Sequence, residues 1–260
     1  MAYNTLKLEI AADLATITLD RPEKRNAIST EMIEELVIAL GHAESSAARV
    51  VILTGAGKAF CSGMDLEALK AIATQSPLEN LEDSRRFARL LRRIWSFPKP
   101  AIAAVNGPAI AGGCGIATVC DFTLAAPDAK FGYTEVRIGF IPAIVSVFLR
   151  RQIGEKAARD LLLTGRIIDA AEALRLGLIT RVVPAEDLMA TAKDLAATLI
   201  SSSPTSLLKT KRLLTEFAAA HIDRELELAV AENAQIRSTP DFREGLSSFL
   251  EKRAPSWSGS

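Results

Sequence analysis

Residues 6–20 alternate between apolar and polar side chains on either side of the short segment Ala11-Ala12-Asp13. Alternation with a period of two places one set of side chains on each face of a β-strand. A brief interruption between two such runs is typical of a hairpin turn. We therefore predict an antiparallel hairpin near the start of the chain.

Three short segments consist almost entirely of apolar or small residues: VVILTG at 50–55, AIAAVNG at 101–107 and DFTLAA at 121–126. Such runs are typical of strands that are buried on both faces of a sheet. Between the hairpin and the first run, residues 31–44 have apolar positions with helical spacing, and Ser29 precedes them as a helix N-cap. Strands that alternate with helices predict an α/β fold.

Beyond residue 185 the sequence changes to consecutive helical patterns. The segment Ser201-Ser202-Ser203-Pro204 interrupts these patterns, as loop residues do. We place there the boundary between a core, residues 1–200, and a C-terminal helical region, residues 201–260. The helices predicted in this part of the chain are 187–202, 206–220, 224–238 and 241–253.

The composition is that of an ordinary soluble chain, with 49% hydrophobic and 24% charged residues among 260. The 31 basic and 31 acidic residues balance, so we expect neither nucleic acid nor a membrane as a partner. The three cysteines form no CxxC pair and only two histidines occur, which argues against a metal site. An odd number of cysteines without a recognisable secretion signal indicates a reduced, cytoplasmic protein.

Two segments share one design: a buried strand, a turn of small residues and the start of a helix. They are GKAFCSGMDLEAL at 57–69 and NGPAIAGGCGIA at 106–117. The first N–H groups of a helix lack internal acceptors, and glycine lets another group approach that backbone closely. Two such turns on neighbouring strands can direct two N–H groups at one oxygen, forming an oxyanion hole. The alternative is tight strand-to-helix packing without a ligand.

One carboxylate lies in the otherwise apolar segment FGYTEVRIGFIP at 131–142, namely Glu135. Apolar neighbours indicate that this carboxylate is desolvated, and desolvation raises the pKa of a carboxyl group toward the range of a useful general base. The alternative is a structural carboxylate paired with Arg137 or another cation.

The motifs FCSGMDL at 60–66, AVNGPAIAGGCGIATVCD at 104–121 and FGYTEVRIGFIPA at 131–143 together resemble the crotonase, or enoyl-CoA hydratase/isomerase, superfamily. The resemblance extends over nearly the whole chain. It implies an α/β fold with a crotonase-type ββα spiral core and a C-terminal helical region that forms a homotrimer or a dimer of trimers. It also implies an acyl-CoA thioester as substrate, with coenzyme A as part of that substrate and no separate cofactor.

The resemblance assigns the two oxyanion-hole N–H groups to Met64 and Gly112, and it makes Glu135 the catalytic acid or base. Hydratases of this superfamily commonly carry a second glutamate at the position that Gly115 occupies here. The chain therefore departs from the two-glutamate pattern. No residue at this position of the chain can therefore take the part that the second glutamate has in the family.

Contacts with coenzyme A and the acyl group are implied in the same way. The loop that begins at Lys24 corresponds to the cradle for adenine and phosphates, and Arg137 would pair with a substrate carboxylate unless it is a surface arginine. Phe249 and Lys252 correspond to positions contributed by a neighbouring subunit, although Lys252 also fits a solvated helix face. The implied binding residues are Lys24, Arg25, Ala27, Met64, Asp65, Leu66, Glu67, Gly112, Arg137, Phe249 and Lys252.

Five arginines lie between residues 85 and 93, on a segment with apolar residues at helical spacing. The simplest interpretation is an amphipathic helix with a solvated basic face. Two functional alternatives are contact with the 3′-phosphate of coenzyme A and contact with RNA.

Three functions remain open. The first is addition or removal of water across the C2=C3 bond of an enoyl-CoA, with Glu135 as acid and base. The sequence around Glu135 most resembles bacterial methylglutaconyl-CoA hydratases, which suggests 3-methylglutaconyl-CoA and the breakdown of branched-chain amino acids or fatty acids. The second is a Δ3,Δ2-enoyl-CoA isomerase that uses Glu135 alone. The third is a non-catalytic binder of acyl-CoA or RNA.

Overall fold

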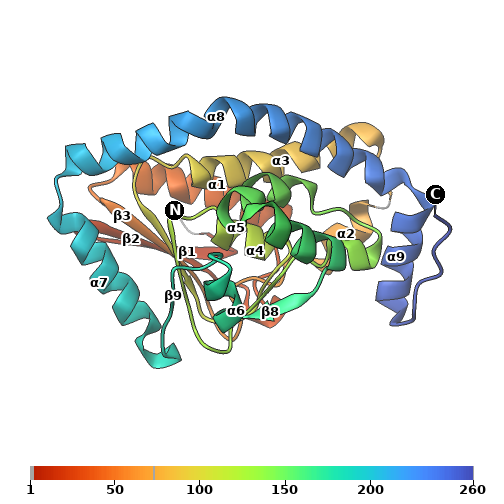
Figure 1. Cartoon of the computed structure of the whole chain (residues 1–260), viewed down its shortest axis with the longest axis horizontal. Helices are drawn as coiled ribbons and strands as arrows, with labels where there is room; N and C mark the ends of the chain where they lie inside the picture. The colour runs from red at the N-terminus through yellow and green to blue at the C-terminus, as the bar shows by residue number, and fades with distance from the viewer. Residues whose placement is uncertain (1–2, 73, 260) are drawn as a thin grey trace.

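A computed structural model describes residues 3–72 and 74–259, and it contains a six-stranded sheet with helices on both faces (Figure 1). The strand order is β1-β2-β3-β4-β6-β9, in which only β1 and β2 are antiparallel. A second, three-stranded sheet has the order β5-β7-β8. The strands are β1 Leu6–Ala11, β2 Leu14–Leu19, β3 Val50–Gly55, β4 Ala101–Val105, β5 Ala109–Ile110, β6 Phe122–Ala125, β7 Lys130–Gly132, β8 Ile167–Asp169 and β9 Arg181–Val182.

The apolar runs form the central strands because both faces of the large sheet are covered. In β3, Val51 and Leu53 join the main core, whereas Val50 and Ile52 pack with residues of helix α7, Leu188–Ser201. Strand β4 is buried along its whole length. The predicted hairpin and the three predicted strands are confirmed.

The helix predicted after Ser29 is α1, and the Ser29 hydroxyl caps it by accepting a 3.2 Å hydrogen bond from the Met32 N–H. Among the described residues, no helix combines the length and apolar character that crossing a membrane requires. The α-helices are α1 Thr30–Ser45, α2 Leu66–Ile72, α3 Pro77–Trp95, α4 Gly112–Thr118, α5 Ala143–Thr164, α6 Ala170–Arg175, α7 Leu188–Ser201, α8 Pro204–Gln235 and α9 Pro240–Glu251. The described residues also form the 3-10 turns η1 Pro22–Lys24, η2 Glu135–Ile138, η3 Ala185–Asp187 and η4 Ile236–Ser238.

Segments 206–220 and 224–238, predicted as two helices, form the single helix α8 and the turn η4 that follows it. The prediction of two helices is wrong because residues 221–223 contain neither glycine nor proline to end a helix. Ile222 in this stretch is fully buried. Helix α8 lies lengthwise along α3 and packs on α5 (Figure 1), so the helical region predicted from residue 201 onward lies directly on the core.

Helix α9 sets the position of η2, the 3-10 turn that begins with Glu135. A Cβ added to Gly245 of α9 would lie 2.3 Å from the Ile138 carbonyl group. On the opposite side, Gly139 has φ 66° and would place a Cβ 2.3 Å from the Asp241 carbonyl oxygen. Only glycine permits so close an approach of the two backbones.

Gly245→Ala is therefore expected to push α9 away from η2 and to lower the free energy of unfolding by about 1–3 kcal/mol. The matched control is Gly41→Ala in α1, where an added Cβ meets nothing within 4 Å; that change should raise stability by about 0.5–1 kcal/mol, because alanine favours helix. Urea unfolding of both variants measures the difference. Equal effects of the two substitutions would contradict the packing described here.

Candidate active site

Two turns of the chain lie against each other, one immediately before Met64 and one immediately before Gly112. Gly63 has φ 91° and Ala111 has φ 50°, a region that residues with a Cβ rarely adopt. A Cβ built on Gly63 would lie 3.2 Å from the Ala111 Cβ. Unusual backbone conformations held in place by their surroundings concentrate at functional sites.

The N–H groups of Met64 and Gly112, which follow these two residues, are left without acceptors among the residues that the structure describes. Their neighbours are paired: the Asp65 N–H donates to the Ile28 carbonyl at 2.9 Å, and the Ala111 N–H donates to the Gly132 carbonyl at 2.7 Å. Unpaired backbone donors are rare in folded proteins. Two of them on adjacent turns form a site for one oxygen atom that carries negative charge.

Glu135 is the buried carboxylate near these donors. The residue is 9% exposed, and its Oε2 has no hydrogen-bond partner among the described residues. Burial raises the pKa of Glu135 from 4.5 to about 7. The pairing with Arg137 considered above does not occur, since Oε2 is unpartnered and Arg137 is exposed. The carboxyl group can therefore both accept and release a proton near neutral pH.

A cavity of about 590 Å³ joins these groups. Met64, Gly112 and Glu135 line it, and most of the rest of the wall is apolar. Every predicted site residue except Arg137 and Lys252 contributes to this wall, which brings together Lys24, Arg25, Ala27, Met64, Asp65, Leu66, Glu67, Gly112, Glu135 and Phe249.

The two predicted residues outside the cavity wall are Arg137 and Lys252. Arg137 is exposed on η2, and its Cγ would lie 3.2 Å from a Cβ on Gly165, at the end of α5. Arg137 does not line the cavity of its own chain, and its contact with a substrate carboxylate stays a prediction. Lys252 is the exposed C-cap of α9. Phe249 lines the cavity of its own chain, whereas we expected it to serve a neighbour.

The position of the absent second glutamate, Gly115, lies on α4 facing α5. A Cβ added to Gly115 would lie 2.6 Å from Val145 Cγ1 and 3.4 Å from Leu91 Cδ1. Val145 itself lines the cavity. A valine of α5 thus fills the space that a longer side chain at position 115 would need.

The loop that carries Lys24, Arg25 and Ala27 is held by an arginine that the sequence analysis missed. The Arg21 guanidinium donates to Asp65 Oδ2 at 2.8 Å and to the Ala27 carbonyl at 2.7 Å. Asp65 also accepts a 2.8 Å hydrogen bond from the N–H of the residue two positions later, in α2. The Asp65 side chain therefore ties the loop to the start of α2.

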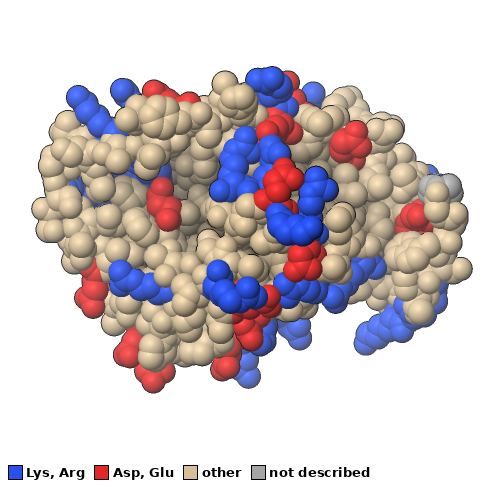
Figure 2. Space-filling model, viewed as in Figure 1, with Lys and Arg blue, Asp and Glu red and all other residues tan. Residues whose placement is uncertain are grey.

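The five arginines of α3 pair with acidic residues, and none of them lines the cavity. On the face drawn in Figure 2, basic and acidic side chains lie interspersed. The solvated-face interpretation fits this arrangement. The pairs are Arg85 and Arg89 with Glu82, Arg86 with Glu34 and Asp83, Arg92 with Asp223, and Arg93 with Glu44.

Two cysteines, Cys61 and Cys114, lie buried beside the two turns. Burial raises the pKa of Cys61 to about 12 and that of Cys114 to about 11. Both thiols are therefore protonated near neutral pH and act as packing groups, since only a thiolate is an effective nucleophile.

Comparisons with known proteins agree with this site. The family model for enoyl-CoA hydratase/isomerase matches residues 9–260. A protein of Thermus thermophilus, named provisionally as an enoyl-CoA hydratase, is 45% identical over 243 residues, which is 93% of this chain and 96% of that protein. The short-chain-enoyl-CoA hydratase of Clostridium acetobutylicum is 35% identical over 97% of both chains. The crystal structure of an enoyl-CoA hydratase from Mycobacterium avium, 36% identical, superposes with a TM-score of 0.87 over 98% of this chain and 99% of that one.

The chain therefore belongs to the enoyl-CoA hydratase/isomerase family, which is the superfamily that its motifs indicate. The prediction of an α/β protein with a crotonase-type spiral core is confirmed.

Glu135→Gln tests the burial of the carboxylate without any substrate. The folded protein holds the Glu135 proton more tightly than the unfolded chain does, so the wild type loses stability as the pH rises from 4.5 to about 7. The variant lacks this loss and should gain about 3 kcal/mol relative to the wild type across that interval. Urea unfolding at pH 4.5, 6 and 8 measures the gain, and a difference that does not vary with pH would contradict it.

Proposed function

We propose that this protein hydrates the C2=C3 bond of an enoyl-CoA thioester, or removes water in the reverse direction. One observation carries the proposal: within the described part of the chain, a buried carboxylate with one unpartnered oxygen shares a cavity with two backbone N–H groups that lack acceptors. Buried polar groups are normally paired. An unpaired base and an unpaired pair of donors fit a reaction that moves a proton while negative charge develops on a carbonyl oxygen.

In the hydration direction, the thioester carbonyl accepts hydrogen bonds from the Met64 and Gly112 N–H groups. Glu135 removes a proton from a water molecule, and the resulting hydroxide forms a bond to C3. The electrons of the C2=C3 bond shift to C2 and the carbonyl, giving an enolate held by the two N–H groups. Glu135 then returns its proton to C2, so one carboxyl group completes the addition of water.

These steps use backbone N–H groups, one carboxylate and water, so we propose no cofactor beyond the coenzyme A of the substrate. Lys24 and Arg25 lie in the cavity wall and carry positive charge suited to the phosphates of coenzyme A. The named hydratase of Clostridium acetobutylicum acts on short-chain substrates, which supports crotonyl-CoA as the first substrate to test. The 3-methylglutaconyl-CoA expectation came from the sequence around Glu135, and Arg137, the residue expected to pair with a substrate carboxylate, lies outside the cavity wall.

The second candidate is the Δ3,Δ2-enoyl-CoA isomerase, in which Glu135 removes a proton from C2 and returns it to C4 without adding water. The Val145 methyl group beside Gly115 favours it, because no second carboxylate can hold the attacking water from that position. The desolvated carboxyl group argues against a non-catalytic binder, because binding alone does not require a buried base.

The trimer and the cytoplasmic location also remain proposals. Helix α8 exposes Leu213, Leu214 and Phe217, each more than half exposed, and exposed apolar patches of this kind favour association. Three free cysteines are typical of a reducing compartment.

The purified protein is expected to convert crotonyl-CoA into a product that has gained one water molecule. Glu135→Gln should lower kcat by about 10²–10⁴-fold, the usual contribution of general acid–base catalysis, while acyl-CoA binding persists. The matched control is Glu9→Gln on the exposed face of β1, which should retain full activity.

Mass spectrometry of the products separates the candidates. Conversion of 3-hexenoyl-CoA to its conjugated isomer, with no hydration of crotonyl-CoA, would identify the isomerase instead. Full hydratase activity in Glu135→Gln would contradict the mechanism.

A further inference from the structure

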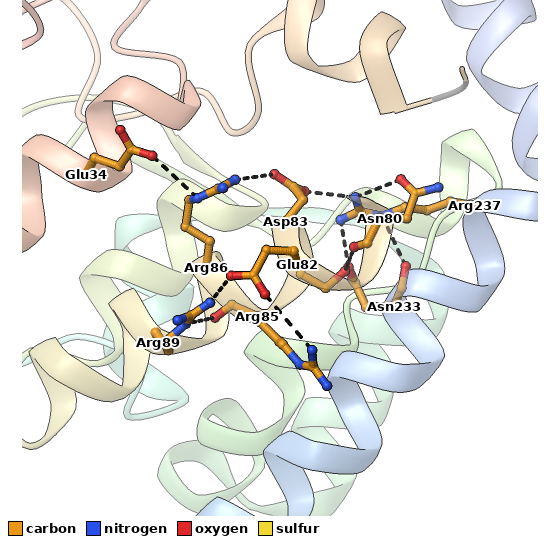
Figure 3. Close-up of polar contacts among 10 residues, drawn as sticks. Glu34, Asn80, Glu82, Asp83, Arg85, Arg86, Arg89, Asn233 and Arg237 are labelled. Carbon is orange, nitrogen blue, oxygen red and sulfur yellow. Dashed lines mark hydrogen bonds and ion pairs between the residues drawn. The ribbon is translucent and has the colours of Figure 1, made fainter. Parts of the chain in front are cut away.

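An ion pair between a buried arginine and a partly buried aspartate interrupts the otherwise largely apolar wall of the cavity. Arg237 Nη1 lies 2.8 Å from Asp83 Oδ2, and both residues line the cavity (Figure 3). Arg237 is only 3% exposed. Asp83 lies on α3 and Arg237 on η4, so the pair joins two segments that are distant in the sequence.

The guanidinium of Arg237 is held rigidly by neutral groups as well. Its Nε donates to the Asn233 carbonyl at 3.2 Å, its Nη2 to Asn233 Oδ1 at 3.0 Å, and its Nη1 to Asn80 Oδ1 at 3.3 Å. The Ser84 hydroxyl donates to Asn233 Oδ1 at 2.9 Å. Asn233 also lines the cavity. The polar wall is therefore a fixed structure.

Stability alone does not explain this arrangement. Removing two charges from water costs several kcal/mol each, and well-packed apolar side chains in place of a buried ion pair are often neutral or stabilising. An apolar wall would also suit an unsubstituted alkyl chain better. Polar groups fixed in an apolar cavity are typical of ligand recognition.

The pair lies beside the reacting groups. Phe87, one helical turn after Asp83 on α3, has its ring 3.0 Å from the position of a Cβ on Gly112. On the other side, the Arg237 guanidinium lies 5.5 Å from the Phe140 ring centroid, and the Phe140 N–H donates to the Glu135 carbonyl at 3.0 Å. Because the oxyanion hole, Glu135 and the ion pair line one cavity, we infer that an acyl chain bound there extends toward this wall.

The charges of the pair select the kind of group that it can bind. The Asp83 and Glu34 carboxylates together balance the charges of Arg237 and Arg86, so a carboxylate on the substrate would face a like charge at close range. Asp83 Oδ1 is 3.7 Å from Arg86 Nη1, beyond hydrogen-bond distance, and can accept another hydrogen bond. A hydroxyl group can donate to Asp83 while it accepts from the guanidinium.

We propose that Asp83 and Arg237 form a specificity element for enoyl-CoA substrates that carry a hydroxyl group on the acyl chain beyond C3. The inference rests on the proposed function, since it assumes that an enoyl-CoA thioester occupies the oxyanion hole. It adds the chemical class of the acyl group, which the family resemblance leaves undetermined.

Matched pairs of 2-enoyl-CoA thioesters, with and without a hydroxyl at C4, C5 or C6, test the inference. The test variant is Asp83→Leu/Arg237→Met, which removes both charges together. The control is Arg92→Met/Asp223→Leu, which removes an ion pair that joins α3 to α8 and does not line the cavity. The readout is the ratio of kcat/KM for the hydroxylated and the plain substrate.

The wild type and the control are expected to prefer the hydroxylated substrate. The test variant should lose about 10- to 100-fold of that preference, the size of one hydrogen bond to a charged group. An unchanged ratio in the test variant would show that the pair is only structural. A wild-type preference for 3-methylglutaconyl-CoA that disappears in the test variant would overturn the hydroxyl class in favour of a carboxylate.

Two further measurements test the inference if the proposed hydration is not observed or if the double variant does not fold. If no enoyl-CoA is hydrated, the preference is measured instead as the ratio of the Kd values of two saturated thioesters, 5-hydroxypentanoyl-CoA and pentanoyl-CoA. A difference in affinity that disappears in the test variant supports the proposed role of the ion pair. Equal affinities in the wild type overturn that role. If the double variant does not fold, Asp83→Glu replaces it. That substitution keeps the charge, shifts the acceptor and should weaken the preference by about tenfold; an unaltered preference would count against the inference.

Discussion

The catalytic arrangement depends on one backbone constraint: two adjacent turns in which Gly63 and Ala111 take positive φ values. The contact between these two residues keeps the following N–H groups together and without acceptors. Donors fixed in this way need no reorganisation when charge develops on a carbonyl oxygen, which is why preorganised donors contribute so much to rate. Parallel strands β3 and β4 make the arrangement possible, because they deliver both turns at the same edge of the sheet.

The second requirement of the site is a desolvated carboxylate close to those N–H donors. The close approach of α9 to η2, with glycine on each side, fixes the backbone at Glu135, and burial keeps its carboxyl group protonatable near neutral pH. Where relatives commonly carry another glutamate, Val145 occupies the space beside Gly115. In the proposed mechanism one carboxyl group both accepts and returns the proton, and the proposed role of Asp83 and Arg237 is to recognise the substrate.

Much of this site could be predicted from the sequence because its parts are local. Strand, turn and helix follow one another within a few residues in both oxyanion segments, and Glu135 stands out as the only acid in an apolar stretch. The partnership of Asp83 with Arg237 could not be predicted, since it joins residues 154 positions apart and neither has a local signature. Arg137 is close to Glu135 in the sequence, but its side chain does not line the cavity, because a 3-10 turn directs neighbouring side chains to different sides. The continuity of α8 was missed since helical periodicity gives no sign of where a helix stops unless a breaker is present.

The most direct test of the central claim is a vibrational spectrum of crotonyl-CoA bound to Glu135→Gln, in which the substrate persists long enough to observe. Isotope-edited infrared difference spectra would isolate the stretching band of the thioester carbonyl. If the Met64 and Gly112 N–H groups both bind the carbonyl oxygen, the band moves to a lower frequency than in free crotonyl-CoA in water, because the two fixed donors polarise the bond more than solvent does. A band at or above the frequency in water would show that the two turns do not form an oxyanion hole.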